Sequence, residues 1–82
     1  MGRYIVRFFT VEGPFSSLKR EAFDTDAAAL EAIRKHAASG GMTGVKAHQD
    51  EGDGETRWTA TTKGGRAGRN IASSWYEDEA WT

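Results

Sequence analysis

The stretch DTDAAALEAIRKHAASGG, residues 24–41, decides how this chain is organised, because it predicts a single amphipathic helix. Its apolar side chains recur at helical spacing: Ala27, Leu30, Ile33 and Ala37. Asp24 is expected to cap the N-terminus, where a side-chain oxygen accepts a hydrogen bond from a free backbone N–H. The helix is expected to end at Gly40 and Gly41, because the closing turn favours a left-handed residue.

Segments rich in β-branched and aromatic residues flank this helix on both sides and predict strands. Two precede it, RYIVRFFT and SLKREAF, at residues 3–10 and 17–23. Three follow it, GVKAHQD, ETRWTATT and NIASSWY, at residues 44–50, 55–62 and 70–76. The turn EGDG, residues 51–54, favours antiparallel pairing of the strands beside it. We therefore predict an α+β fold of two layers in the order ββαβββ, an antiparallel sheet of about five strands with one helix packed on one face.

Length and composition limit what such a domain can do. With 82 residues and no cysteine, the chain is expected to form a single domain, residues 1–82, without disulfides or thiolate metal sites. Residues 76–82 are expected to form a loosely ordered tail. The longest apolar runs are far too short to cross a bilayer, and the N-terminus lacks the apolar region of a signal peptide. We therefore expect a cytoplasmic location and no membrane association.

The residues do not form a recognisable catalytic or cofactor motif. His48 and Asp50 share one face of a predicted strand, but no suitably placed nucleophile accompanies them. The acidic stretch DEGDGE, residues 50–55, lacks the ligand spacing of a calcium loop. The stretch KGGRAGR, residues 63–69, has the glycines of a phosphate loop but leads into a strand instead of a helix. We expect no enzymatic activity, no cofactor and no metal, with His36 and His48 both exposed.

Charge is distributed along the sequence in patches, although the formal net charge is only −1. The low net charge argues against a general nucleic-acid binder, and the segregation of the charges favours surfaces that meet a specific partner. Trp, Tyr and Arg dominate interface energetics, and this short chain contains three Trp and two Tyr. The candidate partner-binding residues are a basic set, Arg57, Lys63, Arg66 and Arg69, and an acidic set, Asp50, Glu51, Asp53 and Glu55.

The sheet face without a helix is the expected position of a flat polar surface, formed by Arg57, Thr59 and Thr61 or their neighbours. Trp58 is expected between sheet and helix, while the sequence leaves the position of Trp75 open. A small nucleic-acid-binding module is the alternative function. Its basic edge would comprise Lys46, Arg57, Lys63, Arg66 and Arg69, and its stacking faces would be Trp58, Trp75 and Tyr76. The acidic residues 77–79 count against this alternative because they would repel a phosphate backbone.

The order of elements resembles the small phage-encoded anti-CRISPR proteins that act on type I surveillance complexes (Cascade), particularly of types I-C and I-F. The resemblance covers nearly the whole chain. It rests on length, on strand–helix order, and on the passage EAFDTDAAALEAIRKHAASGG, residues 21–41, without a signature motif. It implies a non-enzymatic inhibitor that binds a Cascade subunit in the bacterial cytoplasm and interferes with recognition of target DNA. Contact with nucleic acid would be weak or indirect. The resemblance transfers no functional residue, and a phage accessory or structural protein is a further alternative.

Overall fold

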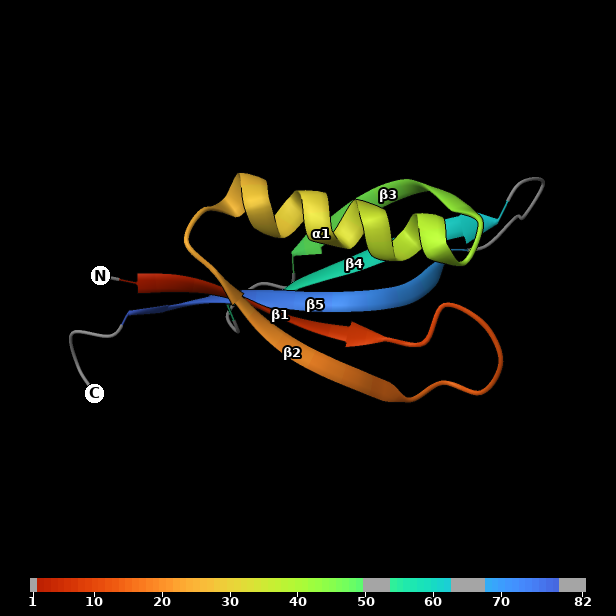
Figure 1. The fold of residues 1–82 in the computed structure, drawn as a ribbon, viewed down its shortest axis with the longest axis horizontal. Coiled ribbons are helices and arrows are strands. Elements are labelled where there is room, and N and C mark those ends of the chain that lie inside the picture. The colour runs from red at the N-terminus through yellow and green to blue at the C-terminus, as the bar shows by residue number, and fades with distance from the viewer. Residues whose placement is uncertain (1, 50–53, 63–67, 79–82) are drawn as a thin grey trace.

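A computed structural model of the chain describes residues 2–49, 54–62 and 68–78. Its elements are β1 (Gly2–Phe9), β2 (Ser17–Phe23), α1 (Asp26–Ser39), β3 (Met42–Gln49), β4 (Thr56–Thr62) and β5 (Arg69–Asp78). The strands form one five-stranded antiparallel sheet in the order β2-β1-β5-β4-β3 (Figure 1). The predicted α+β fold and its ββαβββ order are confirmed.

The core lies between α1 and one face of the sheet, which gives two layers (Figure 1). Successive strand residues point to opposite faces, so every second residue of β1 meets the helix. Val6 and Phe8 of β1 are buried in this way, together with Ile33 and Ala37 of α1. Trp58 is half-buried against the same core, as predicted. The second face of the sheet carries no helix among the described residues.

The helix begins one residue later than predicted. Thr25 is the N-cap: its backbone is extended, and its Oγ1 accepts a hydrogen bond from the backbone N–H of Ala28 at 3.1 Å. The prediction that Asp24 caps the helix is therefore wrong, since both residues carry a suitable oxygen and only the backbone conformation selects between them. The end of the helix is as predicted, with Gly40 as the C-cap and Gly41 at φ 70°.

The buried stripe of α1 also differs from the prediction. Ile33 and Ala37 are buried as expected, but Ala29 completes the stripe in place of Ala27, which is exposed. Leu30 is half-buried. In an alanine-rich helix, several faces have similar hydrophobicity, so packing against the sheet decides which alanines are covered.

The central strand β5 extends further than its sequence suggested. Its register pairs Gly2 with Asp78 and Tyr4 with Tyr76, so β1 pairs with this strand from Ala72 to Asp78. The predicted loosely ordered tail is therefore wrong for residues 76–78, while residues 79–82 lie outside the described part. No helix among the described residues is long and apolar enough to cross a membrane.

Candidate anion-binding face of the sheet

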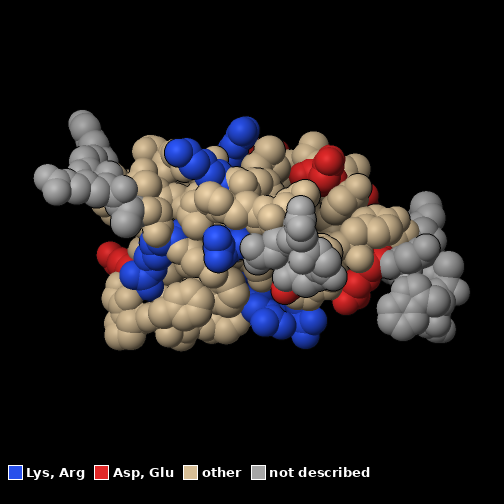
Figure 2. Space-filling view, turned by 180° about the vertical axis from the view of Figure 1, so that it is seen from behind, with Lys and Arg blue, Asp and Glu red and all other residues tan. Residues whose placement is uncertain are grey.

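The open face of the sheet is the face turned away from α1, and it carries a group of exposed cationic side chains. Alternation along each strand places one set of exposed cations on it: Arg3 and Arg7 of β1, Arg20 of β2, Lys46 of β3 and Arg57 of β4. Figure 2, which shows the molecule from behind, has Lys and Arg side chains at several places across this side. By the same alternation Glu77 of β5 lies on this face as well, so the face favours an anionic partner where the cations gather, away from Glu77.

Strand register brings five of these open-face side chains into one line across the sheet, which we name the arginine row. Its members, in order from β2 to β3, are Arg20, Arg7, Ser73, Arg57 and His48. Directly opposed residues on neighbouring strands have their Cβ atoms about 5 Å apart, so each member is the cross-strand neighbour of the next. Because Arg7 and Arg20 are directly opposed, two like charges meet here at a cost that a bound anion would relieve.

Trp75 lies beside this row, two residues after Ser73 on the same face of β5, where it pairs with Ile5 of β1. The guanidinium Cζ of Arg7 is 5.6 Å from the centroid of its ring, and that of Arg20 is 5.9 Å away. These distances are within the range of cation–π attraction, which offsets part of the repulsion between the two arginines. The indole Nε1 donates to Glu77 Oε1 at 3.0 Å, which fixes the orientation of the ring. Trp75, whose position the sequence left open, therefore belongs to the open face.

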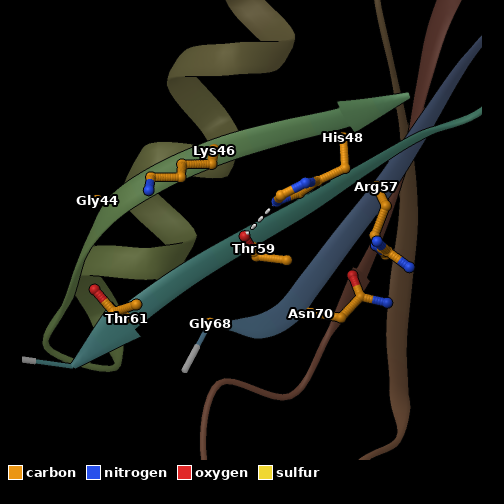
Figure 3. A pocket seen from close by; sticks show the side chains of 8 residues that line it. All are labelled: Gly44, Lys46, His48, Arg57, Thr59, Thr61, Gly68 and Asn70. Carbon is orange, nitrogen blue, oxygen red and sulfur yellow. Dashed lines mark hydrogen bonds between the residues drawn. The ribbon is translucent and has the colours of Figure 1, made fainter. Parts of the chain in front are cut away.

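The other half of the open face contains a groove over β3, β4 and β5 with a volume of about 740 Å³ (Figure 3). We name it the basic groove; it is lined by Gly44, Lys46, His48, Arg57, Thr59, Thr61, Gly68 and Asn70. The side chain of His48, on β3, points towards β4, where its Nε2 lies 3.0 Å from Thr59 Oγ1. Among the described residues, the lining combines two permanent cations with hydroxyl and amide groups and includes no carboxylate, so this part of the groove suits a ligand that carries negative charge.

Asn70 adds an unsatisfied polar atom to the wall of the groove. Its Oδ1 is buried, and it has no hydrogen-bond partner among the described residues. A buried acceptor without a donor costs about 1–3 kcal/mol. Because Oδ1 is buried, the groups that the groove presents to a ligand are its cationic and hydroxyl donors.

The structure describes three of the eight predicted partner-binding residues, Arg57, Glu55 and Arg69. Arg57 lies on the open face, in both the arginine row and the basic groove. Glu55 is exposed just before β4. The remaining basic and acidic candidates except Arg69 lie outside the described residues: Lys63, Arg66, Asp50, Glu51 and Asp53.

Arg69 has a different environment from the one expected of a surface patch. Its Nε donates to the carbonyl of Thr10 at 3.0 Å, and its Nη2 donates to Thr10 Oγ1 at 2.9 Å and to the carbonyl of Gly13 at 2.8 Å. The side chain is half-buried and holds the β1–β2 loop against the start of β5. Three of its donors are therefore used within the protein.

Sequence reasoning did not select Arg7 and Arg20 as site residues. The signal for Arg7 was available, because alternation in β1 already placed Arg7 opposite to the buried Val6 and Phe8. For Arg20 the signal was weaker, since β2 is exposed on both faces from Ser17 to Ala22 and shows no clear buried side. Only the pairing of β1 with β2 brings the two guanidinium groups together.

The prediction that both histidines are exposed is wrong, because each is half-buried and contacts other residues. His36 is half-buried, and its Nε2 donates to the carbonyl of Phe9 at 2.5 Å while its ring packs edge-on against Phe8. His48 is half-buried in the basic groove. Within the described ranges, no three His, Asp or Glu side chains gather closely enough to hold a metal ion.

No protein-family model, curated protein or solved structure matches this chain. Function is therefore inferred from the chemistry of the open face.

Proposed function

We propose that this protein is a non-enzymatic binding domain that holds a single-stranded nucleic acid on the open face of its sheet. The observation that carries the proposal is the arginine row, in which Arg20, Arg7 and Arg57 lie across four neighbouring strands with one Ser between them. With strands about 4.8 Å apart, the whole row spans about 19 Å, which is long enough to follow a chain of phosphates instead of a single ion.

The shape of the face favours a single strand over a duplex. The major groove of a duplex admits a helix or a two-stranded ribbon, whereas a broad sheet face presents neither. Single strands bind to flat faces where a basic track follows the backbone and aromatic rings receive the bases. Trp75 is the half-buried aromatic residue beside the row, and Arg7 and Arg20 already lie over its ring. Guanidinium planes can stack on bases in the same way as an aromatic ring.

The basic groove would extend the same binding track towards β3. Lys46 and Arg57 provide charge from adjacent strands, and Thr59 and Thr61 provide hydroxyl groups that can donate to phosphate oxygens. The proposal is of binding without turnover, because these groups donate and stack and none is arranged as a nucleophile with its base.

Inhibition of a type I Cascade in the bacterial cytoplasm is the second candidate. It is supported by the ββαβββ order, on which the resemblance to anti-CRISPR proteins rests. An exposed face rich in Arg with a neighbouring Trp is also typical of protein interfaces. In this case the open face would dock on an acidic patch of one Cascade subunit, and nucleic acid alone would not be bound.

Fluorescence anisotropy with labelled single-stranded DNA and RNA, over a range of salt concentrations, tests the first candidate. We expect the affinity to fall steeply with salt, because phosphate contacts release counterions. Arg57→Gln should weaken binding and lower the salt slope by about one contact. Arg34→Gln removes the same charge from the exposed side of α1 and should leave binding unchanged.

Two outcomes would contradict the proposal. Equal loss of affinity in Arg57→Gln and Arg34→Gln would mean that the open face is not the contact surface. Absence of oligonucleotide binding at low salt, together with co-elution of the protein with a purified Cascade, would establish the second candidate instead.

A further inference from the structure

The sheet has two edges, formed by β2 and β3, and the described residues protect them unequally. Along β3 the pairing register shifts between Thr43 and Lys46, and Gly44 has φ 63°, so this edge is irregular. Irregularities of this kind prevent a further strand from adding to the sheet. In β2 the register shift is confined to the beginning of the strand, next to Leu18. From Lys19 to Phe23 β2 pairs with β1 without interruption, and its other side has no strand partner among the described residues.

The sequence of β2, SLKREAF, is complementary to itself when two copies run antiparallel. If Arg20 of one copy faces Arg20 of the other, Lys19 of each copy lies opposite Glu21 of the other. Lys19 and Glu21 both point to the helix side of the sheet, because their partners on β1 are the buried Phe8 and Val6. The two side chains are already ion-paired within one strand at 3.2 Å, so their charged ends occupy the same small region.

Apolar residues support the same register. Leu18 is exposed over 56% of its surface, an unusual position for a leucine on an edge strand. In the self-paired arrangement Leu18 of each copy lies opposite Ala22 of the other, on the open side, and both become partly covered. A foreign strand without this order of charges would leave Lys19 or Glu21 opposite an unmatched group.

We infer that two copies of this chain pair through β2, antiparallel, about a two-fold axis at Arg20. The contact is isologous, so it closes after two copies and leaves the irregular β3 edges at the ends of the joined sheet. The partner that fits this edge is therefore a second copy of the chain. This inference does not depend on the proposed function.

The arrangement has a consequence for that function, and this consequence does rest on the proposed function. The two arginine rows would meet end to end at Arg20, which would double the length of the basic track. The meeting of like charges at the axis opposes pairing, so an anion bound there would favour the dimer. Because coupling of this kind is reciprocal, nucleic acid should promote dimerisation and dimerisation should tighten nucleic-acid binding.

Sedimentation velocity over a range of protein concentrations tests the pairing, with three variants and one control. Lys19→Glu places carboxylates opposite each other in both cross-strand pairs, and Glu21→Lys places ammonium groups there. Each should raise the dimer dissociation constant by about tenfold or more. The double variant Lys19→Glu/Glu21→Lys restores both pairs with their polarity reversed and should return to near the wild-type constant.

Arg34→Glu is the matched control, because it makes the same charge change at an exposed position of α1 that does not line the pocket beside Lys19 and Glu21, and it should not alter dimerisation. A wild-type chain that stays monomeric at every concentration would overturn the inference, as would a dimer that the single variants leave intact or the double variant fails to restore. Pairing with a strand of another protein in place of a second copy would also overturn it. A dimer that forms as predicted while no oligonucleotide binds would contradict the proposed function and leave the inference standing.

Discussion

Arg7 and Arg20 lie directly opposite each other on β1 and β2, and both guanidinium groups sit over the ring of Trp75. Opposed like charges destabilise a sheet by about 0.2–1 kcal/mol, while exposed cation–π contacts return about 0.5–1 kcal/mol. The two effects are similar in size, so the pair persists without a bound anion. It is nonetheless arranged to gain when one arrives, which is the physical basis of the function proposed for this face.

Repulsion between these arginines predicts a salt effect on stability. Because salt screens exposed charges, the free energy of unfolding of the wild type should rise as sodium chloride is added at low ionic strength. Arg7→Gln removes the repulsion and should reduce this rise, with stability in low salt within about 0.5 kcal/mol of the wild type. Urea unfolding at low and high salt measures both quantities, and Arg34→Gln on α1 is the control. An identical salt response in Arg7→Gln and the wild type would contradict this account.

Arg69→Ala should lower the free energy of unfolding by about 2 kcal/mol, because it leaves the carbonyls of Thr10 and Gly13 without their charged donor. Arg69→Lys should recover little, since a single ammonium group cannot reproduce donation from two guanidinium nitrogens. Thermal unfolding and hydrogen exchange of the β1–β2 loop would measure the loss. If Arg69→Ala keeps its stability and instead loses partner binding, Arg69 acts as the contact residue that the sequence suggested.

The N-terminus of α1 offers a test between two adjacent residues. Thr25→Ala should cost about 1 kcal/mol, because the backbone N–H of Ala28 loses its acceptor. Asp24→Ala should cost much less, since Asp24 lies outside the cap position and contributes only weak attraction to the helix dipole. Chemical denaturation of the two variants side by side decides between them. A larger loss in Asp24→Ala would mean that the cap predicted from the sequence is the correct one.

Gly41 tests the backbone conformation that ends the helix. A Cβ at this position would have no heavy atom within 4 Å, so a substitution meets no steric obstacle, but φ is 70°. Gly41→Ala should therefore cost about 1 kcal/mol through backbone strain alone. Gly41→Asn should cost less, because asparagine adopts the left-handed region more readily. Equal costs for the two substitutions, measured by urea unfolding, would show that the effect does not come from φ.

Local sequence patterns were sufficient for the secondary structure. The Ala-rich segment with its glycine pair predicted α1, and β-branched and aromatic runs predicted all five strands and their order along the chain. These patterns predict secondary structure because residue spacing, turn chemistry and the pattern of apolar residues all indicate the same elements. The choice between Asp24 and Thr25 as the cap was beyond them, since both side chains can accept the same bond.

For the candidate site, the sequence alone determined that Arg57 faces away from the core, because it alternates with the buried Ala60 and half-buried Trp58. Only the tertiary structure decided that Arg7 and Arg20 join it, since strand order and register are not encoded in any one strand. Tertiary structure likewise gave Arg69 a role within the protein, because the β1–β2 loop, distant in sequence, supplies its acceptors. Strand pairing brings together charges that are far apart in the sequence, and local patterns do not specify which strands pair or in which register.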